Sequence, residues 1–364
     1  MLKVCEFIRD NNNWEELLRS NPYNVFIKHQ NNLILLNYMQ GASAVCDITN
    51  ECRGLVLDIT DDRNPKVVRC GFYRFFNLGD PNAAPIGNHI TAYEKVDGSL
   101  IFLYHANGKW CFGTRNTFDI EVDEVTAGNT PKLRKMARQI RSVLNPNIFD
   151  SLNKNFTYCF EFVSPDFQII VPYEKPDMYL LMIRDNNTLK EVETSVSVEF
   201  KKPKVYSLNS ISEIEKYVSQ FSATEFEGIV VKDENNNRIK IKNLNWLQLH
   251  YLYNNGQFSD RYFIHLYMND DYQELLSYFA NLKERFNKVV NRYNTIKEAA
   301  RLMDNIPVDT IMTKKQFFEI VDRTVKDKGF QMLALKSYNN CAYNWFCMLD
   351  EHWYSHYFVK EDQE

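Results

Sequence analysis

Long apolar runs are missing from this sequence of 364 residues, and none approaches the roughly 20 residues of a membrane-spanning helix. Residues 1–13 also lack the basic-then-apolar pattern of a secretory signal. We therefore expect a protein without membrane attachment. Its expected location is the cytoplasm, or the host cytoplasm if a virus encodes it.

Paired cysteines are missing as well. None of the eight cysteines forms a C-x-x-C pair, and no cluster of cysteine and histidine has zinc-ligand spacing. Several cysteines stand in apolar, strand-like runs, which predicts buried, reduced thiols. His352 and His356 could share a helix face, but no third ligand is near them in the sequence, so we expect no metal there.

The chain also has no excess of positive charge. Lysine and arginine total 43 against 47 acidic residues, so any contact with nucleic acid must come from local patches. One such patch is a helix predicted to begin at Thr130-Pro131, whose basic residues are Lys132, Arg134, Lys135, Arg138 and Arg141. A solvated helix face and a contact with an RNA backbone both explain this pattern.

The first two-thirds of the chain are rich in strand patterns. Strand-like runs include 156–163, 168–171 and 178–183, and Asn107-Gly108 predicts a hairpin turn. After about Trp246 the pattern becomes helical. Apolar residues three or four apart from Leu275 to Ile296 predict one long amphipathic helix. We expect an α+β fold with two domains, 1–245 and 246–364, of which the second is all-helical.

A lysine with a nearby turn marks the most informative stretch, Tyr93 to Leu100. Lys95 ends one strand-like run, Asp97-Gly98 turns the chain, and a second run follows. A lysine can act as a nucleophile only when neutral, and near neutral pH deprotonating a free lysine costs about 4–5 kcal/mol. Burial and nearby cations reduce that cost. A nucleophilic role for Lys95 therefore requires cations from elsewhere in the chain; otherwise it is a solvated hairpin lysine.

Charged residues of the required kind occur later in apolar strands. Lys240 and Lys242 alternate with isoleucines and so share one strand face, where they could grip a phosphate or remain in water. Glu161 and Glu227 each stand inside an apolar run and must pair with a cation, a metal or a ligand hydroxyl. Arg53, which precedes Gly54 and an apolar run, is a similar case.

The order of these motifs resembles the covalent nucleotidyltransferases, which comprise ATP- and NAD-dependent ligases and messenger-RNA capping enzymes. The closer resemblance, over about residues 30 to 250, is to the bacteriophage T4 RNA ligase 1 family. The shared motifs are Glu51-Cys52-Arg53-Gly54, Phe75-Phe76-Asn77-Leu78, Lys95-x-Asp97-Gly98-Ser99-Leu100, Phe160-Glu161-Phe162-Val163-x-Pro165, Glu227-Gly228 and Lys240-Ile241-Lys242.

The resemblance implies a fold and a reaction. Residues 1–245 would form a nucleotidyltransferase domain of antiparallel sheets with flanking helices, similar to the ATP-grasp fold. Lys95 would attack the α-phosphate of ATP and become a lysyl-adenylate. AMP would then pass to an RNA 5′-phosphate, and a 3′-hydroxyl would attack that end and release AMP. The enzyme would be an ATP-dependent RNA ligase.

The resemblance also implies residue roles. Beside Lys95, Lys240 and Lys242 would bind the α-phosphate, and Arg53 would contact phosphate or help in the later steps. Glu227, together with Glu161, would hold Mg²⁺, for which Mn²⁺ is an alternative, and Glu161 would accept a hydrogen bond from the ribose. The implied nucleotide-binding residues are Arg53, Arg74, Glu94, Lys95, Arg115, Glu161, Val230, Lys240 and Lys242. Arg74 and Arg115 stand where the phage enzyme has lysines, which keeps the charge but changes the hydrogen-bond geometry.

The implied partner is RNA with 5′-phosphate and 3′-hydroxyl ends, such as a broken transfer-RNA anticodon loop. A separate end-healing kinase/phosphatase would prepare those ends, and the helical domain would help to select the RNA. One alternative is a DNA ligase or a capping guanylyltransferase, which would carry a β-barrel after the Lys-x-Lys motif. Another is a catalytically silent RNA-binding protein on the same scaffold.

Overall fold

The computed structural model describes residues 1–39, 43–121, 130–195, 199–255, 260–269, 272–278, 282–304, 313–324, 326 and 331. The chain divides into two compact units, Met1–Asn254 and Asn255–Glu364. The first unit continues past the expected boundary at residue 245, because Trp246 in α7 (Leu244–Asn255) is only 2% exposed and hydrogen-bonds to Asp97. Within the described ranges, no helix combines the length and apolarity needed to cross a membrane.

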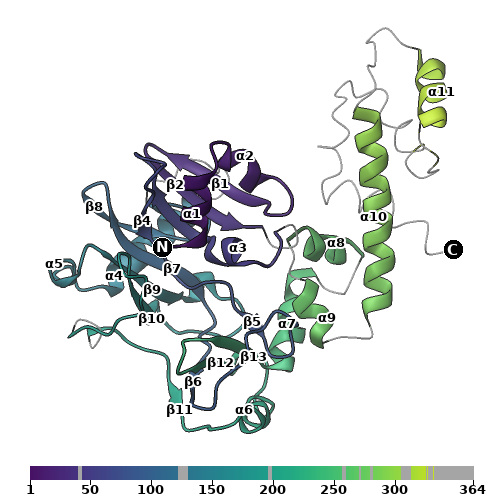
Figure 1. Ribbon diagram of the computed structural model, residues 1–364. Coiled ribbons are helices and arrows are strands. Elements are labelled where there is room, and N and C mark those ends of the chain that lie inside the picture. Colours follow the sequence, from purple (N-terminus) through teal and green to yellow (C-terminus); the bar gives the residue numbers. More distant parts are fainter. Residues whose placement is uncertain are drawn as a thin grey trace. The chain divides into compact units, whose positions relative to one another are not determined.

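Three sheets build the first unit (Figure 1). The first sheet contains, in order, β1 (Val25–Gln30), β2 (Leu33–Tyr38), β3 (Arg53–Asp58) and β4 (Lys66–Arg69). The second contains β10 (Asp177–Asp185), β9 (Phe156–Val163), β7 (Ser99–Ala106) and β8 (Lys109–Gly113). The third contains β11 (Val205–Tyr206), β6 (Ile90–Glu94), β12 (Gly228–Asp233), β13 (Arg238–Lys242) and β5 (Phe76–Asn77). All neighbouring strands are antiparallel except β13 and β5, which run parallel.

Helices cover one face of each sheet. Helices α1 (Lys3–Asp10) and α2 (Trp14–Arg19) share an apolar core with the first sheet, and α3 (Asp47–Glu51) precedes β3. Helices α4 (Thr130–Val143) and α5 (Ile148–Ser151) cover the second sheet, and α6 (Ile211–Val218) covers the third. A fourth core lies between the first two sheets. The expected α+β architecture with largely antiparallel sheets is confirmed.

The third sheet has two different faces. Ile229, Val231, Ile239 and Ile241 point into the core with α6. Because strand side chains alternate, the residues between them point to the other face. On that face Val230 is paired in register with both Tyr93 of β6 and Lys240 of β13. The face of the third sheet that points away from α6 is therefore where the strand lysines gather.

One expected strand, 168–171, is wrong. That segment is irregular and follows the short helix Pro165–Phe167. The backbone N–H groups of Ile170 and Val171 donate to the buried Asp97 carboxylate instead of to a neighbouring strand. A tertiary contact with a side chain has replaced sheet pairing.

The described residues of the second unit are helical, as expected. They form α8 (Asp260–Asn269), α9 (Tyr272–Tyr278), α10 (Lys283–Asp304) and α11 (Lys314–Thr324). The predicted single helix from Leu275 to Ile296 corresponds to the end of α9 and the start of α10, with 279–281 between them outside the described residues. Thr313 and Gln316 cap the start of α11. His352 and His356 lie outside the described residues.

Gly228 is required by the backbone at the start of β12. Its φ is +153°, and a Cβ atom there would lie 2.2 Å from the carbonyl oxygen of Ile241. We expect Gly228→Ala to lower the free energy of unfolding by about 2–4 kcal/mol, because neither the φ angle nor the neighbouring strand accommodates a side chain. Urea unfolding measures this change, and a loss below about 0.5 kcal/mol would contradict the assignment.

Candidate functional site

Three side chains meet where β6, β12 and β13 end or begin. Lys95 follows β6, and its backbone N–H donates to Gly228 O over 2.9 Å. Its Nζ lies 2.6 Å from Oε1 of Glu227, which precedes β12. Lys242, the last residue of β13, places its Nζ 3.6 Å from the same oxygen. Residues almost 150 positions apart in the sequence thus form one charged centre, as the motif order predicts.

Glu227 lies between the two lysines and is only 3% exposed. Burial raises the pKa of Glu227, while the positive charges of Lys95 and then Lys242 oppose that rise. We expected cations to converge on Lys95, and Lys242 does so. The closest charged partner of Lys95, however, is a carboxylate that both lysines share.

Glu161 brings the second sheet into the site. It lies on β9, opposite Leu100 of β7 and Tyr179 of β10. Burial raises the pKa of Glu161 to about 8, with Glu227 acting in the same direction and Lys95 and Arg53 opposing it. Glu161, Glu227, Lys95 and Arg53 therefore share one electrostatic environment.

The raised pKa of Glu161 predicts how stability depends on pH. An unfolded chain releases this proton near pH 4.5, whereas the folded protein keeps it until about pH 8. The stabilisation is therefore complete below the lower value and is lost as pH rises to the higher one. We expect Glu161→Gln to remove a slope of about 1 kcal/mol per pH unit from the free energy of unfolding between about pH 5 and 8. Urea unfolding across this range measures it, and parallel curves for both proteins would contradict the assignment.

Phe75 connects two of the predicted phosphate ligands. The Arg53 guanidinium lies 5.7 Å from the centre of its ring, and Lys240 Nζ lies 5.3 Å from the same point. β5, the strand directly after Phe75, pairs with β13 and so fixes this arrangement. The aromatic motif that begins at Phe75 therefore holds Lys240 and Arg53 on one ring.

Tyr38, which the sequence did not single out, is surrounded by three arginines. Arg115 Nη1 donates to its hydroxyl oxygen over 3.5 Å, the Arg74 guanidinium lies 4.5 Å from its ring centre, and Arg53 lies close enough for Tyr38 to affect its pKa. Burial and the nearby Arg115 lower the pKa of Arg53. The buried Nη1 of Arg53 has no hydrogen-bond partner among the described residues. Such a concentration of partly buried positive charge suits an anionic ligand.

Asp97, which the sequence suggested only as a turn residue, is a buried anchor. One oxygen, Oδ2, accepts hydrogen bonds from Ile170 N at 2.9 Å, Val171 N at 2.7 Å and Trp246 Nε1 at 3.1 Å. Its backbone N–H donates to the Tyr173 hydroxyl. Two segments, 170–173 and the start of α7, are thus tied to the turn that follows Lys95, and nothing in the local sequence pattern indicates this.

Two predicted nucleotide ligands lie beside this centre. Val230 is half-buried on the lysine-bearing face of the third sheet. Glu94 directly precedes Lys95. Burial raises the pKa of Tyr206, and the negative charge of Glu94 raises it further, which places the Glu94 carboxylate near Tyr206. By strand alternation, the Glu94 side chain therefore points to the face opposite Tyr93 and Lys95.

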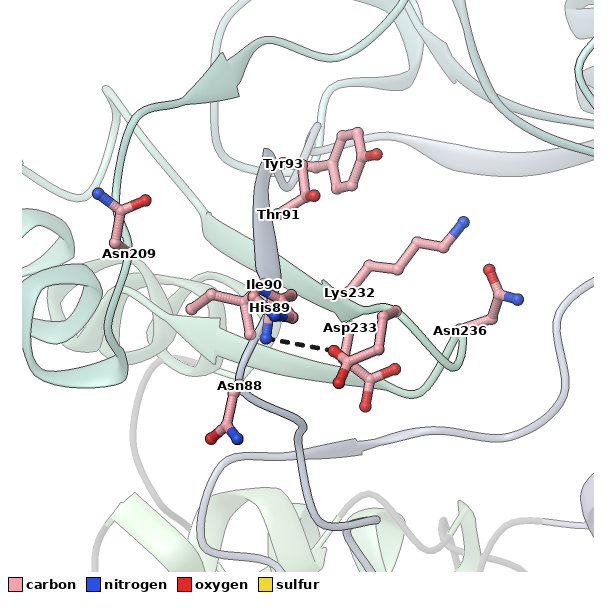
Figure 2. A pocket seen from close by; sticks show the side chains of 10 residues that line it. Asn88, His89, Ile90, Thr91, Tyr93, Asn209, Lys232, Asp233 and Asn236 are labelled. Atoms are coloured by element: carbon pink, nitrogen blue, oxygen red, sulfur yellow. Dashed lines mark hydrogen bonds between the residues drawn. The ribbon is translucent and has the colours of Figure 1, made fainter.

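A cavity of about 570 Å³ opens further along these strands (Figure 2). Thr91 and Tyr93 of β6 line one part of it, and Asp233 and Asn236, near the β12–β13 turn, line another. Its edge is fixed by a hydrogen bond from His89 N to Glu234 Oε2, and Lys232 in its wall forms an ion pair with Glu191. Tyr93, which lines the cavity, is paired in register with Val230, but the lining includes none of Lys95, Glu227 and Lys242.

Two carboxylates of the site, those of Glu227 and Glu161, could act as ligands of a metal ion. No group of three or more histidine, cysteine or acidic residues that could hold an ion occurs in the part of the chain that the structure describes. Glu227 and Glu161 remain, and Mg²⁺ is commonly held by one or two carboxylates together with substrate phosphates and water. Both lysine contacts of Glu227 use Oε1. The donor set therefore fits a hydrated divalent cation that arrives with a phosphate ligand.

Comparisons with known proteins agree with the motif order. A family model described as RNA ligase, of the T4 RNA ligase 1 type, matches residues 51–263. This range contains Arg53, Lys95, Glu161 and Glu227 as well as both motif lysines.

Curated relatives carry the same description. A protein of Autographa californica nuclear polyhedrosis virus, provisionally named a bifunctional polynucleotide kinase/RNA ligase, is 29% identical over 76% of this chain and 41% of its own length. A provisionally named RNA ligase of Thermovibrio ammonificans is 26% identical over 73% of this chain and 72% of its own. The chain therefore spans less than half of the viral relative. A solved archaeal ATP-dependent RNA ligase aligns over 78% of this chain and 78% of its own at 13% identity, with a TM-score of 0.48.

Proposed function

Because the chain belongs to the RNA ligase family of bacteriophage T4 RNA ligase 1, we propose that it joins RNA ends with ATP through a covalent Lys95–AMP. The observation that carries this proposal is the buried centre in which Glu227 Oε1 lies 2.6 Å from Lys95 Nζ and 3.6 Å from Lys242 Nζ. A lysine held this way at a strand end is positioned to be a nucleophile rather than a solvated charge.

In the first step, Lys95 Nζ forms a bond with the α-phosphorus of ATP, and the bond to pyrophosphate breaks. Lys95 must first lose a proton, and Glu227 Oε1 is the acceptor closest to it. Lys242 and Lys240 offset the negative charge at the α-phosphate, as phosphoryl transfer requires. The pyrophosphate portion would contact the three arginines around Tyr38, namely Arg53, Arg74 and Arg115.

The base and ribose would occupy the face of the third sheet beside Lys95. Val230 and Tyr93 offer an apolar surface for adenine, opposite β10 of the second sheet. Glu161 would form a hydrogen bond with a ribose hydroxyl, whereas the Glu94 side chain, on the opposite face of the sheet, would not contact the nucleotide. Glu227 and Glu161 would hold a divalent cation, Mg²⁺ or Mn²⁺, which supplies positive charge beside the phosphates.

In the later steps, AMP passes from Lys95 to an RNA 5′-phosphate, and a 3′-hydroxyl then attacks that phosphate and releases AMP. We assign selection of the RNA, such as a broken transfer-RNA loop, to the helical second unit. A 5′-phosphate needs a supplier, and the viral relative's name includes a polynucleotide kinase. We propose that a separate end-healing kinase/phosphatase acts before this protein, in the cytoplasm.

Circularisation of RNA tests the proposal. Single-stranded RNA with a 5′-phosphate, incubated with the protein, ATP and Mg²⁺, should give circles and a transient adenylylated RNA. GTP in place of ATP should give neither. Sealing only of nicked DNA, or transfer of GMP to a 5′-diphosphate end, would favour the alternatives and overturn the RNA ligase assignment. RNA binding without any nucleotide transfer would indicate a catalytically silent protein.

A further inference from the structure

Trp246 contacts both Lys242 and the turn that follows Lys95, although no motif includes it. It lies in the first turn of α7, four residues after Lys242, and is 2% exposed. Its indole N–H donates to Asp97 Oδ2 over 3.1 Å. Lys242 Nζ lies 4.8 Å from the centre of its ring, and His250 stacks on the ring at 4.8 Å with an angle of 15°.

The bond to Asp97 matters because Asp97 belongs to the turn that presents Lys95. This carboxylate is 3% exposed, and the same oxygen also receives the N–H groups of Ile170 and Val171. A buried carboxylate without enough donors is strongly unfavourable, so each donor restricts where the turn can lie. The indole is the donor that connects this turn to the chain after β13.

The contact with Lys242 matters because Lys242 shares Glu227 with Lys95. A cation over an indole face is attracted by the ring, and the attraction is larger away from solvent. Lys242 is 10% exposed, so the ring limits where its ammonium can move. One side chain thus restrains the Lys95 turn through its N–H group and Lys242 through its ring.

We propose that Trp246 is a positioning residue that sets the distance between Lys95 and Lys242 for transfer of AMP. This inference rests on the proposed function, since it names a further determinant of the same site. Misplacing reacting groups by about 1 Å can lower a rate a hundredfold without changing the binding of substrate. Trp246 should therefore affect the rate of adenylation and leave the KM for ATP almost unchanged.

The test separates the two contacts. Trp246→Phe keeps an aromatic face for Lys242 but removes the N–H group, whereas Trp246→Leu removes both. We expect adenylation of Lys95 to slow about tenfold in Trp246→Phe and further in Trp246→Leu, at unchanged KM for ATP. Trp14→Phe is the matched control, because Trp14 is equally a buried tryptophan of the first unit but belongs to the core of α1 and α2.

Three results would overturn the inference. The first is adenylation by Trp246→Phe within about twofold of wild type. The second is that the Trp246 variants lose adenylation rate only in proportion to their lower melting temperature, and that Trp14→Phe shows the same relation. The third comes from the wild-type protein, in which the Trp246 indole N–H resonance should shift on loading with AMP while that of Trp14 does not; an unchanged Trp246 resonance contradicts the inference even if the variants do not fold. Absence of labelling in wild type would instead refute the proposed function, and the inference with it.

Discussion

Replacing Lys95 with arginine should abolish formation of the protein–AMP adduct, with a loss of at least about a thousandfold. Arginine keeps the positive charge and can still pair with the buried Glu227, so the fold should survive. It remains protonated at every accessible pH, however, and so cannot attack phosphorus. Labelling with α-labelled ATP, followed by denaturation, measures the adduct.

Two controls sharpen this prediction. Lys216→Arg, in the exposed part of α6, should label like wild type. Lys95→Arg should still join RNA that was adenylylated beforehand, because that last step does not use the lysine as nucleophile. Wild-type labelling of Lys95→Arg would show that another residue carries AMP and would refute the assigned nucleophile.

Glu227→Gln should lower the adenylation rate by about a hundredfold or more. The amide has nearly the shape of the carboxylate, but it can neither balance Lys95 and Lys242 nor accept a proton from Lys95. It is also a weaker ligand for a divalent cation, so the concentration of Mg²⁺ needed for half-maximal labelling should rise. Lys240→Ala should reduce labelling as well, because it removes charge from the α-phosphate.

The chain supplies a matched control for Glu227. Glu225 lies two residues earlier, is exposed, and accepts hydrogen bonds from the backbone and hydroxyl of Ser222. Glu225→Gln should therefore label at the wild-type rate. Equal rates for Glu225→Gln and Glu227→Gln would mean that the buried carboxylate has no part in the reaction.

Sequence patterns predicted part of the charged centre, because Lys240 and Lys242 alternate with isoleucines in a strand and Glu227 stands in an apolar run. Lys240 and Lys242 had to share a face, and an ionised Glu227 inside an apolar run had to find a cation. The sequence could not show that Lys95 and Lys242 share one oxygen of that carboxylate. This depends on the register of β6, β12 and β13, which are set side by side only in the folded chain.

The residues that the sequence missed act through tertiary contacts. Tyr38 ends an ordinary apolar strand, and only folding brings three arginines close to it. Asp97 looks like a turn residue, yet its carboxylate captures the backbone N–H groups of Ile170 and Val171, which is why the strand expected at 168–171 does not form. Local periodicity cannot reveal a side chain that competes with a neighbouring strand for hydrogen bonds.

The broad division into a strand-rich and a helical part was predictable, because the period of apolar residues changes from two to 3.6 along the chain. The partition of the strands into three sheets was not. β5, only two residues long, pairs parallel with β13 although some 160 residues separate them, and the sequence offers no signal for that pairing. It is nevertheless what places Phe75 between Arg53 and Lys240.

The central claim is that AMP becomes attached to Lys95. The most direct measurement is to incubate the wild-type protein with ATP and Mg²⁺, denature and digest it, and locate the added mass by peptide sequencing in a mass spectrometer. The account predicts one AMP per chain, on the peptide that contains Lys95, and its loss when pyrophosphate is added back. AMP on a different residue, or no adduct under conditions that support RNA joining, would contradict it.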